Sequence, residues 1–103
     1  MTDIEIHAGH SATTRSIGEL ADRLRAIPAN KRVSIDTSEL AEVDLSFVQL
    51  MLSLRKHAAA QGQEVHLAKP ATGYLAFALA RAGFLTDPAD ADVDFWFHGE
   101  LPQ

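Results

Sequence analysis

A single hydroxyl residue, Ser46, stands at the predicted start of a helix, two residues after Asp44. Ser46-Phe47-Val48-Gln49 fits a capping box, and a cap by Ser46 or Asp44 would contribute about 1 kcal/mol. A phosphate on Ser46 would instead meet free backbone N–H groups at the helix end. It would add about 1.5 to 2 negative charges beside Glu42 and Asp44. The spacing by itself favours the cap and leaves the phosphate open.

Two carboxylates, Asp36 and Asp44, form a second candidate site. Asp36 falls at the carboxyl end of a predicted parallel strand, the edge where α/β sheets usually place their sites. The pair could serve acid–base chemistry or hold a magnesium ion. Asp36 before Thr37-Ser38 is also typical of a turn, and Asp44 is typical of a helix cap. The structural role is the favoured interpretation for Asp36.

Other chemistry-bearing residues form no recognisable site. His7 and His10 could bind a metal, but no third ligand is evident and a solvated pair is favoured. The remaining histidines are scattered, and no serine–histidine–acid signature is present. No glycine-rich phosphate loop occurs. We therefore expect no cofactor, no metal and no enzymatic activity.

The elements that must position these residues alternate along the chain. Ile4 and Ile6 alternate with polar residues and predict a strand. Ser16-Ile17-Gly18-Glu19 fits a capping box at the start of a helix that Pro28 ends. Residues Arg32–Asp36 contain the β-branched Val33 and Ile35 and predict a central strand.

The second half of the chain continues the pattern. A long helix is predicted from Ser46 to Gly62, a good terminator. Its apolar stripe consists of Phe47, Leu50, Met51, Leu54 and Ala58, widened by Val48 and Leu52. Val65–Leu67 predict another strand, Tyr74–Ala80 a helix ended by Gly83, and the aromatic-rich Val93–Phe97 a last strand. This order predicts βαβ crossovers and an α/β domain with a largely parallel sheet, spanning residues 1–103.

The composition excludes several classes of protein. A formal net charge of -5 argues against nucleic-acid binding and against a polybasic membrane anchor. The chain has no cysteine, so it has no disulfide and no thiolate nucleophile. Neither a signal peptide nor an apolar run of about 20 residues is found. We expect a cytoplasmic protein that does not insert into a membrane.

The segment from Arg32 to Leu85 resembles a STAS domain, the fold of bacterial anti-sigma factor antagonists. An ordered series of segments carries the resemblance: Val33-Ser34-Ile35-Asp36-Thr37-Ser38, Val43-Asp44-Leu45-Ser46, Leu50, Leu54, Arg55, Gly62, Val65-His66-Leu67, Leu79 and Ala82-Gly83-Phe84-Leu85. The resemblance implies a mixed, largely parallel sheet flanked by helices.

The resemblance also implies a function in signal transduction. Many family members are non-enzymatic and bind a kinase-like anti-sigma factor, thereby regulating transcription. Phosphorylation at the start of the second helix releases this partner, and a phosphatase resets the switch. In the family pattern Asp-Ser-Ser/Thr-Gly-Leu, Asp44 matches the aspartate and Ser46 the second hydroxyl residue. Ser46 is thus the expected phosphorylation site.

Two departures from that pattern concern the partner. Leu45 replaces the first hydroxyl residue, and Phe47 replaces a glycine that lets a partner approach the backbone. They suggest a specialised partner or another use of the fold. The expected partner-binding residues are Asp36, Asp44, Leu45, Ser46 and Phe47. Two alternatives stay open: a constitutive accessory subunit, in a chemosensory scaffold or a lipid-transporting ABC complex, and a nucleotide-binding domain. The oligomeric state is also open.

Overall fold

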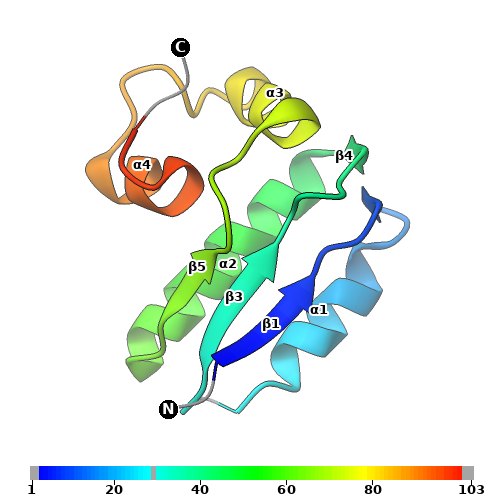
Figure 1. Cartoon of the computed structure of the whole chain (residues 1–103), viewed down its shortest axis with the longest axis vertical. Coiled ribbons are helices and arrows are strands. Elements are labelled where there is room, and N and C mark those ends of the chain that lie inside the picture. Colours follow the sequence, from blue (N-terminus) through cyan, green and yellow to red (C-terminus); the bar gives the residue numbers. More distant parts are fainter. Residues whose placement is uncertain (1–2, 29, 101–103) are drawn as a thin grey trace.

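A three-stranded parallel sheet lies at the centre of the structure, a computed structural model that describes residues 3–28 and 30–100. Its strands are β1 (Asp3–His7), β3 (Arg32–Asp36) and β5 (Val65–Leu67), in the order β1-β3-β5 (Figure 1). The β-branched residues of β3 are fully covered, which is the expected burial for a strand between two neighbours. The predicted strands at these three places are confirmed.

Helices α1 (Ile17–Arg25) and α2 (Leu45–Gln61) connect the strands and lie on the same side of the sheet (Figure 1). The residues that α2 buries are Phe47, Val48, Met51 and Ala58. Leu52 was expected to widen this stripe but is exposed. The helix ends at Gly62, whose φ of 70° places it in the left-handed region that favours glycine. The predicted terminator is therefore confirmed.

Two very short strands extend the structure beyond the carboxyl edge of the sheet. Strands β2 (Ser11–Ala12) and β4 (Glu42–Val43) pair in parallel, in a small sheet of their own that the sequence did not predict. The backbone N–H of Ala41 also donates to the carbonyl oxygen of His10 at 2.8 Å. These bonds hold the segment after β1 beside the segment after β3. The second of these segments leads directly into α2.

Helix α3 (Gly73–Arg81) follows β5 and confirms the predicted third helix. Leu75 and Leu79 are buried in the core, whereas Tyr74 and Phe77 are each 63% exposed. The helix packs beside β4. One of its faces therefore closes the core, and another faces solvent next to the start of α2.

The last predicted element is wrong, because residues Asp90–Phe97 form a helix, α4, and not a strand. The aromatic run Phe95, Trp96 and Phe97 is buried throughout, where α4 packs against β5 and the Trp96 ring contacts Phe84, in the segment after α3. Such a run has a high β propensity, but tertiary packing overrides this preference. Asp90 and Asp92 in the first turn favour a helix through the dipole. Gly99, with φ of 91°, follows its end.

The capping box expected at Ser16 does not form. Ser16 is the residue before α1, but its side chain makes no cap hydrogen bond to the helix. Its hydroxyl oxygen accepts from the backbone N–H of Thr13 at 3.0 Å and donates to the carbonyl oxygen of Ser11 at 3.2 Å. The serine thus stabilises the turn that leads into α1.

The α/β fold class is confirmed, and each strand pair in the described part of the chain is parallel. Among the helices of these residues, none combines the length and the apolarity that a bilayer span requires.

Candidate functional site

The junction between β4 and α2 positions Asp44 and Ser46. Asp44 has extended backbone angles (φ −129°, ψ −175°) and directly precedes the first helical residue, Leu45. Its side chain accepts a hydrogen bond from the backbone N–H of Ser46 at 2.9 Å, which is the contact of an N-cap. Of the two candidate caps, Asp44 is therefore the cap of α2. Ser46 is the second residue of the helix.

The Asp44 carboxylate also joins two segments that are far apart in the sequence. One oxygen accepts from the backbone N–H and the hydroxyl of Ser46. The other accepts from the backbone N–H of Thr14 at 3.0 Å and from its hydroxyl at 3.1 Å. Donation by the Ser46 hydroxyl, followed by that from the Thr14 N–H, lowers the pKa of Asp44 below the ordinary value of an aspartate. These hydrogen bonds thus favour the charged form of the carboxylate.

Ser46 is half-buried, and its hydroxyl donates to the carboxylate that caps the helix. A helix N-terminus presents free N–H groups and a positive dipole end, which favour a negative charge. A phosphoryl group on Ser46 would replace the proton that Asp44 now accepts. The expected phosphorylation therefore implies a rearrangement of the Asp44 side chain.

The neighbours of Ser46 differ sharply in exposure. Leu45 is 53% exposed, so it offers an apolar side chain at the surface of the junction. Phe47 is fully buried in the core. Phe47 was expected among the partner-binding residues, and this expectation needs correction, because a covered side chain supports the helix from below and offers no contact surface.

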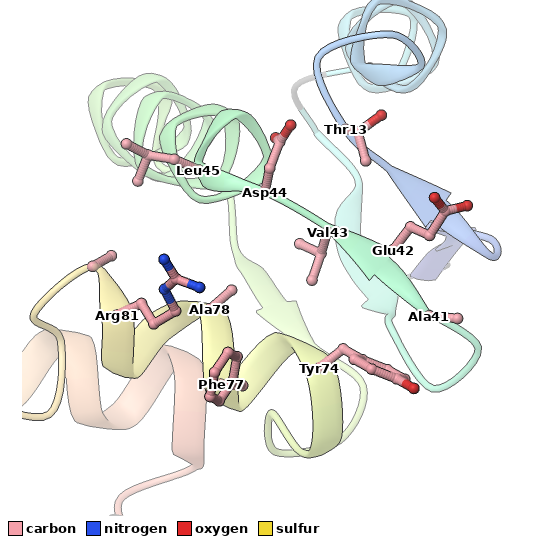
Figure 2. Close-up of a pocket in the computed structure, with 11 residues that line it drawn as sticks. Thr13, Ala41, Glu42, Val43, Asp44, Leu45, Tyr74, Phe77, Ala78 and Arg81 are labelled. Atoms are coloured by element: carbon pink, nitrogen blue, oxygen red, sulfur yellow. The ribbon is translucent and has the colours of Figure 1, made fainter.

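An open groove of about 600 Å³ lies between this junction and α3 (Figure 2). Its lining residues are Thr13, Ala41, Glu42, Val43, Asp44, Leu45, Tyr74, Phe77, Ala78, Arg81 and Ala82. Val43 points toward α3 and forms part of the floor. This groove was not predicted from the sequence, although Tyr74, Phe77 and Arg81 share one helix face at spacings of three and four residues.

Asp36 ends β3 and forms the turn that its sequence context predicts. Its carboxylate accepts from the backbone N–H of Ser38 at 2.9 Å. Hydrogen bonds from Ser38 lower the pKa of Asp36 below its ordinary value. In the described residues no interaction joins Asp36 to Asp44, since each carboxylate has partners of its own. The group of potential metal ligands that the described residues bring within 4.8 Å of one another includes Asp36 but not Asp44.

Asp36 instead belongs to a small polar cluster with Glu5 and His7. His7 Nδ1 lies 3.2 Å from Asp36, and His7 Nε2 lies 3.1 Å from Glu5. This group, and not His7 with His10, is the set of potential metal ligands that the described residues bring together. Glu5 and His7 are two apart on β1, and His7 pairs with Asp36 in register. In the sequence, the signal for this cluster was the position of Glu5 and His7 on one strand face and of Asp36 at the end of the next predicted strand.

The family follows from the comparison with known proteins. Residues 3–84 match a family model described as Mlab, STAS domain. The chain belongs to the STAS domain family. A search of the curated proteins and a search of the solved structures found no match to this chain. The match covers the sheet, α1, α2 and α3, whereas α4 of this STAS domain lies beyond residue 84.

Membership in the STAS family supports a place for this chain among signalling proteins that are similar to anti-sigma factor antagonists. The junction of this STAS domain holds the expected phosphorylation residue, Ser46, beside three of the expected contact residues, Asp44, Leu45 and Phe47, of which Phe47 is buried. Asp36 lies at the end of a different element, β3. Phosphorylation of Ser46 and partner contact at Asp36, Asp44, Leu45 and Ser46 stay predictions.

Proposed function

We propose that this STAS domain is a non-enzymatic signalling module that binds a protein partner and is controlled by reversible phosphorylation of Ser46. The observation that carries the proposal is the contact between the Ser46 hydroxyl and the Asp44 carboxylate at the start of a 17-residue helix. The expected partners are an anti-sigma factor or a kinase-like regulator, and a phosphatase.

Electrostatics gives this contact the properties of a switch. In the unmodified protein the Ser46 hydroxyl donates to Asp44, so the junction is held together. A phosphate at the same place cannot donate that bond, and it adds about 1.5 to 2 negative charges next to a carboxylate. The two anions repel each other. A partner that contacts Leu45 and the residues around it would meet a different charge and a different side-chain arrangement.

A binding comparison tests the proposal. Wild type, Ser46→Ala, Ser46→Asp and a protein with phosphoserine incorporated at position 46 are used to capture partners from cells of the source organism. Wild type and Ser46→Ala are expected to retain the same partner, and the two charged forms are expected to lose it. Equal retention by all four proteins would contradict a phospho-switch.

Phosphate incorporation gives a second measurement. Incubation with the cognate kinase and ATP should add one phosphate, and Ser46→Ala should abolish the addition. Thr14→Ala is the matched control, because Thr14 is the other hydroxyl bound to Asp44. If Thr14→Ala removes the phosphate and Ser46→Ala does not, Ser46 is not the acceptor.

A constitutive subunit is the second candidate function. It is favoured by the complete hydrogen bonding of Asp44, whose two oxygens are satisfied by Ser46 and Thr14 without any phosphate. In this case Ser46 only supports the cap. Ser46→Ala and Ser46→Asp would then leave partner binding unchanged, and the retained partner would be an ATPase or a scaffold protein and not a kinase-like regulator.

A further inference from the structure

We propose that the groove between α3 and the β4–α2 junction is the partner-binding surface, and that its occupant is an amphipathic helix with an acidic side chain that pairs with Arg81. The inference rests on the proposed function as a binding module and specifies the chemistry of the partner.

Apolar exposure is concentrated in this groove. Four large apolar side chains are exposed in the described part of the chain, and Leu45, Tyr74 and Phe77 are three of them. All three line the groove. Exposed apolar residues that gather in one place mark an interaction surface, whereas scattered ones do not.

The exposed face of α3 has the pattern that receives another helix. Tyr74, Phe77, Ala78 and Arg81 follow the spacing i, i+3, i+4, i+7, which places them on one face. Leu75 and Leu79 close the core from the same helix. The second face of α3 is largely apolar, and no element of the described chain covers it. Such a face is suited to helix-in-groove binding.

Arg81 supplies the charge of the groove. Arg81 is the positively charged residue of the lining. Its guanidinium carbon lies 5.8 Å from the centroid of the Phe77 ring. No carboxylate pairs with it in the described residues. In Figure 2 its guanidinium points toward the β4–α2 ribbon, that is, into the groove. A guanidinium in an apolar setting favours a carboxylate partner.

The two acidic lining residues do not compete for this role. The Glu42 and Asp44 side chains point away from α3 in Figure 2, and both Asp44 oxygens are occupied by Thr14 and Ser46. The charge that faces the apolar floor is therefore that of Arg81. The occupant helix would place two apolar residues, about one turn apart, against Tyr74 and Phe77. An Asp or Glu about one turn further along would then pair with Arg81.

An acidic occupant is consistent with the proposed release of the partner by phosphorylation at Ser46. Leu45 and Asp44 line the groove, and Ser46 follows them directly. A phosphate on Ser46 would repel an acidic helix and would attract a basic one.

A peptide selection on the purified, unphosphorylated protein tests the inference. The probe is a displayed library of helical peptides randomised at positions i, i+3, i+4 and i+7, and enriched peptides are measured by fluorescence anisotropy. We expect enrichment of apolar pairs followed by Asp or Glu. Phe77→Ala, Tyr74→Ala and Arg81→Glu should each weaken binding about tenfold or more, as for contact residues at the centre of an interface.

Charge reversal provides the most specific result. A peptide with Lys in place of its selected acidic residue should bind Arg81→Glu and not wild type. Leu52→Ala and Lys56→Glu are matched controls, because both residues are exposed on α2 and lie outside the groove. These two variants should bind like wild type. All substituted side chains are exposed, and circular dichroism verifies that each variant is folded.

Several results would overturn the inference: no enrichment, selection of basic peptides by wild type, or equal losses in the control variants. Sedimentation of wild type that reveals a dimer, which Phe77→Ala converts to a monomer, would make a second copy the occupant and would also overturn it. The selected peptide is finally measured against protein with phosphoserine at position 46. Undiminished binding there would contradict the phospho-switch while leaving the groove in place, so the two failures are distinguishable.

Discussion

At the scale of single residues, Asp44 is more important to the junction than Ser46. The Asp44 carboxylate caps α2 and also fixes Thr14, 30 residues earlier in the chain. Ser46 contributes one hydroxyl to the same arrangement. The resemblance to the family directs attention to Ser46, whereas the hydrogen bonds identify Asp44 as the group through which any change at Ser46 reaches the loop before α1.

Replacement of this carboxylate should destabilise the protein. Asp44→Ala removes a helix cap and leaves the N–H groups of Ser46 and Thr14 without their acceptor, so we expect a loss of about 1–2 kcal/mol in the free energy of unfolding. Ser46→Ala should cost less, because the cap remains. Urea unfolding at pH 7 measures both, with Ser53→Ala, an exposed serine on the same helix, as the control. A cost for Asp44→Ala no larger than that for Ser53→Ala would contradict this role.

At the scale of elements, α4 is an integral part of the core although the family match ends at residue 84. Trp96 is fully buried and makes edge contacts with the rings of Phe84 and Phe95, at centroid distances of 6.1 and 5.0 Å. Arg55 of α2 pairs with Asp92 at 2.7 Å. The helix thus completes the packing of β5 and α2.

Truncation of Trp96 should therefore be costly. Trp96→Ala is expected to lower the free energy of unfolding by about 3–5 kcal/mol, as for other buried aromatic residues. Trp96→Phe should cost much less, because the buried indole N–H has no hydrogen-bond partner in the described residues and its removal leaves no partner unsatisfied. Urea denaturation followed by circular dichroism measures both. Equal, small losses in the two variants would show that α4 is dispensable.

At the scale of the whole molecule, the hydrogen-bonded carboxylates make stability depend on pH. The folded-state pKa values of Asp36 and Asp44 lie below the ordinary value of about 3.9. As the pH falls, the unfolded chain binds protons at these groups before the folded chain does. Their contribution to stability is therefore complete above the ordinary pKa and is lost as the pH falls through the folded pKa values.

We thus expect the free energy of unfolding to decrease between pH 5 and pH 3. These limits bracket the ordinary pKa of about 3.9. The decrease should be smaller in Asp44→Asn, which keeps an oxygen acceptor but has no titrating group at this position. Urea unfolding at several pH values measures it, and Asp22→Asn, at an exposed aspartate on α1, is the control. A decrease of the same size in wild type and Asp44→Asn would contradict the assignment to Asp44.

The sequence by itself determined the elements whose signals are local. The alternation in β1, the apolar stripe of α2 and the helix terminator Gly62 depend on neighbouring residues only, and these predictions are confirmed apart from the exposed Leu52. The proximity of Asp44 and Ser46 was predictable for the same reason, since both lie within one turn. The family resemblance was likewise visible in the order of these segments.

Only the tertiary structure decided which competing local preference prevails and which distant residues meet. The aromatic residues of α4 favour a strand by propensity, but burial against β5 makes them helical. Thr14 reaches Asp44 because β2 and β4 pair. The groove joins α3 to the start of α2. These contacts link residues far apart in the chain, and their free energy comes from burial and hydrogen bonding, which no local pattern encodes.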